Sequence, residues 1–142
     1  MIYTNLTKKA MKIAYNAHLN QVDKSGIPYI FHPIYLAERM EDEESTIVAL
    51  LHDTVEDSEM TINDLKMEGF SENVIDAINC LTHNKNLTYE EYIMGIKINP
   101  LAKKVKLVDL EHNSLIARLD SIDEVTKLRL IKYSKAKEML SE

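Results

Sequence analysis

One segment of the chain joins an apolar helix to side chains that bind metals and transfer protons. The apolar run Ile47–Leu51 ends in His52 and Asp53, and two further carboxylates follow at Glu56 and Asp57. A helix that is apolar on every side is buried, so we expect His52 and Asp53 inside the domain. There an ionised carboxylate is costly unless it is paired or coordinates a metal. Glu56 and Asp57 are expected near the end of this helix, where the macrodipole disfavours acids. Such conflicts with local stability indicate a functional site.

Asp109 provides a further carboxylate in apolar surroundings. It is flanked on both sides by apolar residues, and Asn113 lies four residues further along the same expected helix. Residues four apart share one face of a helix, so Asp109 and Asn113 can both face a single cavity. His32 precedes Pro33, a residue that suits the first turn of a helix, which places His32 at a helix start.

Two imidazoles and two carboxylates make a mixed ligand set that suits Mn, Fe, Co or Zn more than Mg or Ca. The candidate ligands are His32, His52, Asp53 and Asp109. A divalent ion bound there would lower the pKa of a bound water, and Glu56 or Asp57 could orient that water or move its proton. Each of these residues could instead have a purely structural role. His52, Asp53 and Asp109 could form a buried hydrogen-bonded cluster without a metal, His32 could cap a helix, and Glu56 and Asp57 could lie on a solvated turn.

The composition and the capping signals predict an all-α fold. A chain of 142 residues fits one domain. With only 3 Gly and 3 Pro it has few of the turn-forming residues that connect strands and form hairpins. Capping boxes begin at Thr61, Thr88 and Ser121, and Asn99 precedes a proline at a first helical position. These signals and the apolar periodicity predict helices over about 4–19, 33–40, 61–67, 71–81, 88–97, 100–119 and 121–140, besides the buried one. The expected architecture is a single domain over residues 1–142, a bundle of about seven or eight helices.

The charge and the cysteine content narrow the partners and the compartment. A net charge of −6 argues against a nucleic-acid binder, which would carry a basic stripe, but permits a small anionic substrate. One cysteine, Cys80, excludes an intramolecular disulfide and favours a reducing compartment. The first residues lack the apolar core of a signal peptide, and no stretch reaches the length of a membrane span. A cytoplasmic protein without membrane partners is therefore expected, with its oligomeric state left open.

Several motifs, spread over nearly the whole chain, resemble those of one family. They are Ala17-His18-x-x-Gln21, Lys24-Ser25-Gly26-x-Pro28-Tyr29-Ile30-x-His32-Pro33, Ala49-Leu50-Leu51-His52-Asp53-Thr54-Val55-Glu56-Asp57, Leu81-Thr82, Tyr89-x-x-Tyr92 and Val105-Lys106-Leu107-x-Asp109-Leu110-x-His112-Asn113. With these motifs the chain resembles the HD-domain metal-dependent phosphohydrolases. Within that family it is similar to the hydrolase domain of the guanosine tetraphosphate (alarmone) synthetase/hydrolases and to the small stand-alone alarmone hydrolases.

The resemblance implies an all-helical HD domain that holds one Mn-like ion and acts on (p)ppGpp, the nucleotide of the stringent response. By this likeness the ion would be bound by His32, His52, Asp53 and Asp109. Glu56 and Asp57 would be the catalytic acids that activate the water attacking the 3′-pyrophosphate, and Asn113 would face the nucleoside. The substrate pocket would be lined by Lys24, Ser25 and Lys85.

Two segments depart from the family's pattern. Asp23 stands where the alarmone hydrolases commonly have an Arg that stacks on guanine, so an anion replaces a cation beside a polyanionic nucleotide. The family's Thr-Asp-Asp-Lys segment is Thr82-His83-Asn84-Lys85 here. The expected activity is that of a guanosine 3′,5′-bis(diphosphate) 3′-pyrophosphohydrolase. The alternatives are an HD phosphohydrolase for another nucleotide, or a catalytically silent module that binds metal or nucleotide and regulates a partner.

Overall fold

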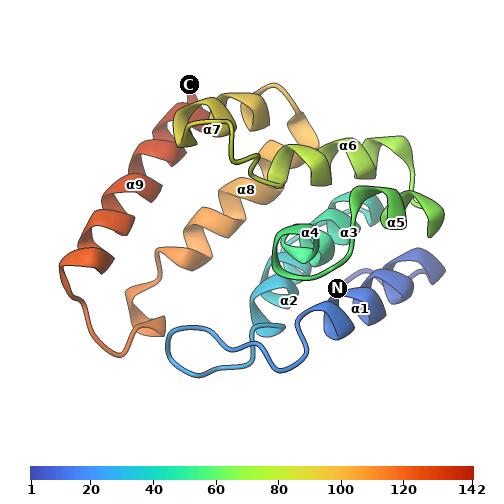
Figure 1. Ribbon diagram of the computed structural model, residues 1–142, viewed down its shortest axis with the longest axis horizontal. Helices are drawn as coiled ribbons and strands as arrows, with labels where there is room; N and C mark the ends of the chain where they lie inside the picture. Colours follow the sequence, from blue (N-terminus) through green and yellow to red (C-terminus); the bar gives the residue numbers. More distant parts are fainter.

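Nine α-helices and one 3-10 helix make up the structure, a computed structural model that describes residues 1–142 (Figure 1). Their bounds are α1 Asn5–Ala17, α2 Phe31–Glu38, α3 Glu43–Leu51, α4 Thr54–Asp57, α5 Ile62–Met67, α6 Glu72–Leu81, α7 Tyr89–Lys97, α8 Pro100–Asn113, η1 Ile116–Arg118 and α9 Glu124–Ser141. The single β-type pairing is an isolated bridge between Val22 and Pro28. The predicted all-α class is confirmed, with the single-turn α4 added to eight longer helices. None of these helices combines the length and the apolar character that a membrane span requires.

Side-chain caps fix where most of the helices begin. Thr61 and Thr88 each form a complete capping box with the residue three positions later, as predicted. Asn99 accepts a hydrogen bond from the backbone of Ala102 at 2.9 Å, and Pro100 occupies the first helical position. These local bonds satisfy backbone N–H groups that have no partner within the helix at its N-terminus. They therefore define where α5, α7 and α8 begin independently of tertiary contacts.

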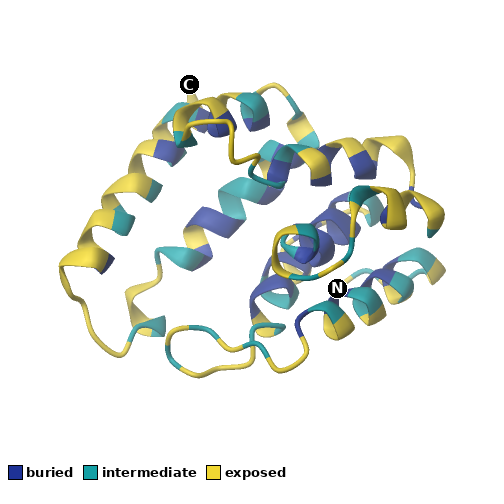
Figure 2. Cartoon of the chain, viewed as in Figure 1, coloured by how far each residue is buried: buried dark blue, intermediate teal, exposed yellow.

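The apolar helix α3 forms the centre of the core. Its residues 45–51 are all buried, and it packs against α1, α2, α6 and α8 (Figure 2). The Asp42 side chain accepts a hydrogen bond from the backbone N–H of Ser45 at 2.8 Å, so the acidic run ahead of α3 serves as its cap. Because neighbouring helices enclose α3, its C-terminal end is held in a fixed place, and the next residue is His52.

Two elements distant in sequence lie side by side at the C-terminal end of α8. The α1–α2 loop, residues 18–30, passes next to η1, and the Ser25 hydroxyl donates to the carbonyl oxygen of Arg118 at 2.6 Å (Figure 1). From there α8 runs across the molecule with α9 on one side and the helices of the first half on the other (Figure 1). The loop, the end of α8 and α9 therefore frame one edge of the molecule.

Helix α8 ends at Asn113, so the predicted helix over 100–119 is too long. The carbonyl oxygen of His112 accepts hydrogen bonds from the backbone N–H of Leu115 at 3.2 Å, a 3-10-type bond, and from the Arg118 guanidinium at 2.9 Å. Ser114 caps the helix, and its hydroxyl donates back to the carbonyl oxygen of Leu110 at 2.6 Å. These side-chain bonds, with no glycine or proline among them, end the helix.

The last helix also begins later than predicted. Its cap is Asp123, which accepts a hydrogen bond from the backbone N–H of Thr126 at 2.8 Å, whereas the sequence pattern pointed to Ser121. Aspartate and serine are cap residues of similar strength, so two candidates two positions apart cannot be ranked from local sequence. Helix α9 therefore starts at Glu124 rather than at Ser121.

The buried helix stops before the two acids that we placed near its end. Helix α3 ends at Leu51, and Glu56 and Asp57 lie on the separate one-turn helix α4. The chain bends at His52 and Asp53, so both side chains sit at a corner between two helices. The acids consequently occupy a short exposed turn, not the C-terminus of a long helix.

The inner face of α6 should contribute strongly to stability. Ile78 is 0% exposed, so Ile78→Ala should lower the free energy of unfolding by about 2–5 kcal/mol, from lost burial and the cavity left behind. Urea unfolding measures this change. Ile98 is 82% exposed, and the matched Ile98→Ala variant should stay within about 0.5 kcal/mol of the parent protein. Equal losses in the two variants would contradict the packing of α6.

Candidate functional site

The four candidate metal ligands converge from separate elements. His32 comes from α2, His52 and Asp53 from the corner between α3 and α4, and Asp109 from α8. One ligand atom from each of these four residues lies within 4.8 Å of the others. His32, His52 and Asp109 are buried, and Asp53 is partly buried. The structure thus brings together all four residues that the sequence singled out for metal binding.

The His52 ring shows that the cluster suits a cation. Its Nδ1 lies 2.6 Å from the carbonyl oxygen of Ala49 and donates to it, so Nε2 carries a lone pair. This Nε2 is buried without a hydrogen-bond partner, 2.9 Å from an Asp53 oxygen and 3.4 Å from an Asp109 oxygen. Burial alone would lower the pKa of His52, but the two carboxylates raise it well above its ordinary value because they favour a positive charge at Nε2. A proton or a divalent ion on the Nε2 lone pair would supply that charge, and the donor set fits the ion.

His32 is oriented by a second imidazole, His112. The two Nδ1 atoms lie 2.7 Å apart, and the rings are stacked with centroids 5.0 Å apart. Burial, together with the nearby Arg118 guanidinium, lowers the pKa of His112 to about 3. A neutral His112 can accept the Nδ1 proton of His32, which leaves the Nε2 lone pair of His32 for the cluster, where Asp109 lies 2.8 Å away.

The two ligand carboxylates are held by hydrogen-bond donors. Lys106 Nζ lies 2.9 Å from one Asp109 oxygen, and the Asn113 amide donates to the other at 3.1 Å. Burial would lower the pKa of Lys106, but the Asp109 carboxylate raises it above its ordinary value, so the lysine stays charged. The Tyr29 hydroxyl donates to Asp53. These bonds fix the rotamers of both carboxylates before a ligand arrives.

Sequence reasoning missed three of these supporting side chains. His112, Tyr29 and Lys106 belong to the motifs named above, but the resemblance assigns none of them a role at the site. The spacing of Lys106 and Asp109, three apart on one helix face, was an available signal for their pair. The contact of His112 with His32 spans 80 residues of sequence and had no local signal.

Glu56 and Asp57 lie next to the cluster on α4. Both are exposed, yet partial burial of their carboxyl groups, reinforced by the neighbouring Asp53 charge, raises the pKa of each above its ordinary value. Glu56 accepts a hydrogen bond from the backbone N–H of His83. Gln21 donates to the carbonyl oxygen of Asp57 at 2.8 Å and so attaches α4 to the end of α1. Carboxylates with raised pKa values beside a candidate metal site are suited to transferring protons.

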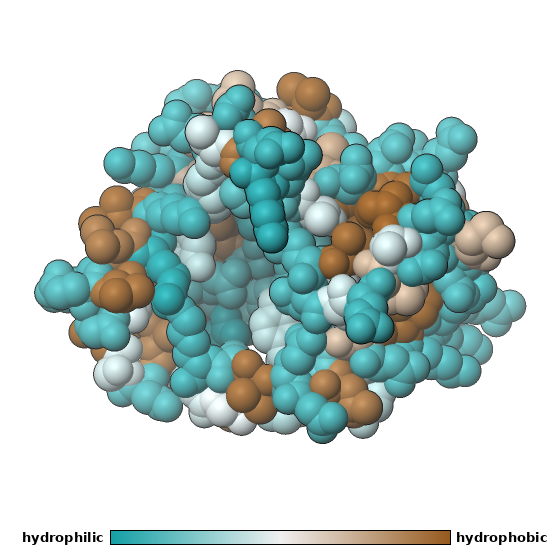
Figure 3. Space-filling view, viewed as in Figure 1, coloured by the Kyte–Doolittle hydropathy of each residue, from teal (hydrophilic) through white to brown (hydrophobic).

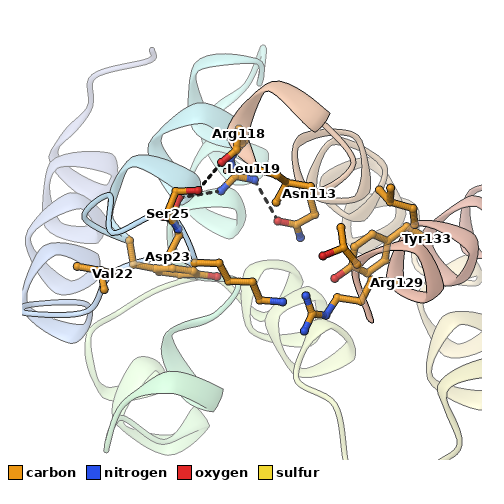
Figure 4. A pocket seen from close by; sticks show the side chains of 12 residues that line it. Val22, Asp23, Ser25, Asn113, Arg118, Leu119, Arg129 and Tyr133 are labelled. Carbon is orange, nitrogen blue, oxygen red and sulfur yellow. Dashed lines mark hydrogen bonds and ion pairs between the residues drawn. The ribbon is translucent and has the colours of Figure 1, made fainter. Parts of the chain in front are cut away.

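A pocket of about 360 Å³ is connected to the cluster through Tyr29 and Asn113, which line it and donate to Asp53 and Asp109. The face is hollowed between α9 and the rest of the molecule (Figure 3). Lys24, Ser25 and Asn113, three of the residues expected to bind substrate, line the pocket together with Arg118 and Arg129. Arg129 and Tyr133 reach in from α9, opposite Ser25 and Asn113 (Figure 4). Among the basic residues of the pocket only Arg118 forms an ion pair, with Asp23 at 3.5 Å. Two cations without acidic partners, Lys24 and Arg129, therefore line a pocket that also includes Asn113, the hydrogen-bond partner of Asp109.

Lys85 is separate from this pocket. It lies on the exposed segment between α6 and α7, two residues after His83, whose backbone bonds to Glu56. The structure therefore places Lys85 on the side of Glu56 rather than beside Lys24 and Asn113. Sequence reasoning did not include Arg118 or Arg129 in the pocket, because basic residues on a surface turn and helix are ordinarily solvated.

The comparison with solved structures defines the class of fold. A metazoan ortholog of SpoT that hydrolyses ppGpp matches with a TM-score of 0.79 and 21% sequence identity. The match covers 99% of this chain and 87% of that one. The chain therefore has the helical HD-domain fold that its motifs predicted. No family model matches the sequence.

Curated relatives make the resemblance more specific. The chain is 32% identical over 144 residues to the guanosine-3′,5′-bis(diphosphate) 3′-pyrophosphohydrolase of Aquifex aeolicus, which covers 95% of this chain and 19% of the relative. It is 30% identical over 121 residues to the bifunctional (p)ppGpp synthase/hydrolase SpoT of Escherichia coli, covering 75% of this chain and 17% of that protein. The chain thus spans less than a fifth of the length of these relatives. Their names and the fold confirm the predicted resemblance to the alarmone hydrolases.

Proposed function

We propose that residues 1–142 form a metal-dependent pyrophosphohydrolase domain acting on guanosine 3′,5′-bis(diphosphate). Water would attack the phosphorus atom attached to the 3′ oxygen and break that P–O bond, giving GDP and pyrophosphate. The observation that carries this proposal is the convergence of two histidines and two aspartates, with the carboxylates of Glu56 and Asp57 and a cationic pocket nearby. The names of relatives similar to nearly all of this chain support the choice of substrate.

The metal would be one divalent ion of the kind that a mixed set of imidazole nitrogen and carboxylate oxygen suits. Among these ions we propose Mn²⁺, because the family that the chain resembles holds a Mn-like ion. The proposed ligands are His32, His52, Asp53 and Asp109. When bound, such an ion supplies a Lewis acid that polarises a phosphoryl oxygen and lowers the pKa of a water. The single free cysteine supports the cytoplasm as its compartment.

The protein's own groups would then orient the reactants and carry the protons. Lys106 and Asn113 hold Asp109, and His112 holds His32, so the ligands need little rearrangement. In this proposal Glu56 or Asp57 accepts the proton of the attacking water, while the other returns a proton to the departing 3′ oxygen.

The substrate would occupy the pocket beside the cluster. Lys24 and Arg129 lack acidic partners there and are suited to the phosphates, whereas Ser25 and Asn113 offer hydrogen bonds to the nucleoside. Lys85, which lies on the same side as Glu56, is proposed to contact the pyrophosphate that is released. All these assignments concern a small anionic nucleotide.

Lys24→Ala should raise KM for guanosine tetraphosphate about tenfold and change kcat less than about threefold, because a phosphate contact made before and during reaction contributes uniform binding. Steady-state kinetics measure both constants. The matched control is Lys104→Ala. Lys104 does not line the pocket, and its Nζ lies 3.3 Å from a carboxylate oxygen of Asp42. A KM equal to that of the control would remove Lys24 from the substrate site.

The second candidate is the same chemistry on another nucleotide, favoured by Asp23, which stands at the pocket wall where the alarmone hydrolases commonly have an Arg that stacks on guanine. Turnover of a panel containing guanosine tetraphosphate, nucleoside mono-, di- and triphosphates and phosphorylated dinucleotides distinguishes the two. Pyrophosphate released from the tetraphosphate alone supports the first proposal, and turnover of another member reassigns the substrate. Bound metal without any turnover would instead indicate a silent regulatory module.

A further inference from the structure

Asp23 divides its two carboxylate oxygens between the loop and the opposite wall of the pocket. One oxygen accepts backbone hydrogen bonds from Ser25 at 2.8 Å and from Ile27 at 3.0 Å, which folds the loop around it. The other lies 3.5 Å from the guanidinium of Arg118, which belongs to η1. The negative charge is therefore compensated within the protein and is not free to repel a phosphate.

Arg118 joins the same loop to the end of α8. Its Nη1 donates to the carbonyl oxygen of His112 at 2.9 Å and to the Asn113 side chain at 3.4 Å. Its own carbonyl oxygen accepts from the Ser25 hydroxyl at 2.6 Å (Figure 4). The planar guanidinium of Arg118 carries several N–H donors, so it can contact Asp23 and the carbonyl oxygen of His112 at once. The single ammonium of a lysine cannot do so.

These contacts connect the loop to the metal cluster. Asn113, which Arg118 contacts, donates to the metal-ligand candidate Asp109 at 3.1 Å. Arg118 also separates the pocket from a second cavity of about 340 Å³, which His32 and His112 line. The guanidinium thus forms part of the wall between two cavities.

We propose that Arg118 is a positioning residue, which holds the loop Val22–Pro28 against α8 and so shapes the nucleoside side of the pocket. It is not a phosphate-binding cation, because Asp23 already neutralises it. Lys24 and Arg129 remain as the cations for the phosphates. The identity of the nucleotide in this inference rests on the function proposed above.

Two substitutions at Arg118 test the inference kinetically. Arg118→Gln should raise KM for guanosine tetraphosphate about tenfold, with kcat changed less than about threefold. The inhibition constant of free pyrophosphate, which has no nucleoside, should change less than about twofold. Arg118→Lys keeps the charge and should not restore KM. Arg129→Gln is the matched control and should weaken the tetraphosphate and pyrophosphate alike.

Hydrogen–deuterium exchange of the loop gives a readout that needs no substrate. The amides of Ser25 and Ile27 should exchange about tenfold faster in Arg118→Gln than in the parent protein. Asp23→Asn, which keeps an oxygen for the loop amides, serves as a second variant if Arg118→Gln does not fold, and it should show faster exchange of Ile27. In the double variant Asp23→Asn/Arg118→Gln, KM for guanosine tetraphosphate should be no higher than in Arg118→Gln alone, because Asp23 and Arg118 act as one unit.

Three results would overturn the inference. They are unchanged loop exchange in the variants, a loss of pyrophosphate affinity in Arg118→Gln equal to that in Arg129→Gln, and full restoration of KM by Arg118→Lys. A parent protein that does not hydrolyse the tetraphosphate would contradict the proposed function instead. The exchange experiment would still decide the positioning role of Arg118.

Discussion

Replacing both Glu56 and Asp57 by their amides should lower kcat for pyrophosphate release about a thousandfold, the range that general acid–base groups supply. Glu56→Gln/Asp57→Asn removes two proton carriers with almost no change in shape. Both side chains are exposed and neither is among the proposed ligands, so the fold and the metal content should persist. Circular dichroism and metal analysis check these two conditions, and stopped assays of pyrophosphate measure kcat.

Glu59 supplies a matched control for the acid variant. It is an exposed acid two residues beyond Asp57 and outside α4, so Glu59→Gln should retain kcat within about twofold. The single variants Glu56→Gln and Asp57→Asn show which acid carries more of the effect. Full activity in the folded, metal-loaded double variant would reject the proton-transfer roles of both residues.

Asp109→Asn should lower affinity for Mn²⁺ at least a hundredfold and reduce activity in proportion. Asp109 is 4% exposed and its oxygens face His32, His52 and Lys106, so neutralising it removes the charge at the centre of the cluster. In the parent protein, Mn²⁺ at about 100 times its dissociation constant should raise Tm by about 5–10 °C. In Asp109→Asn at the same concentration this rise should vanish.

The difference between the Tm values with and without Mn²⁺ reports metal binding separately from any loss of stability that the substitution itself causes. Asp109→Asn also leaves Lys106 without its partner, so its Tm without metal should already be lower than that of the parent protein. Asp76→Asn changes an exposed carboxylate on α6 and should keep the full rise with Mn²⁺. The same metal-induced rise in Asp109→Asn would exclude Asp109 as a ligand.

The sequence predicted the parts of this structure that depend on local chemistry. The burial of α3 follows from its apolar run, and the starts of α5, α7 and α8 follow from caps at Thr61, Thr88 and Asn99. Asp109 and Asn113 face one site because they are four residues apart on a helix. His32 was placed with them by resemblance to a family and by its position at a helix start.

Other features depend on contacts that no local pattern encodes. The end of α8 depends on Arg118 bonding back to His112, and the start of α9 depends on which of two capping residues prevails. The acidic Asp23 suggested repulsion of a nucleotide when considered alone, but the structure pairs it with Arg118, 95 residues away. Charge compensation across such a distance becomes visible only after folding brings η1 to the loop.

The most direct test of the central claim follows the products of guanosine tetraphosphate hydrolysis by protein stripped of metal and then loaded with Mn²⁺. We predict GDP and pyrophosphate in equal amounts with Mn²⁺ and turnover slowed at least a hundredfold without it. Release of single phosphates, unchanged turnover after metal removal, or no turnover with one Mn²⁺ bound per chain would contradict the account.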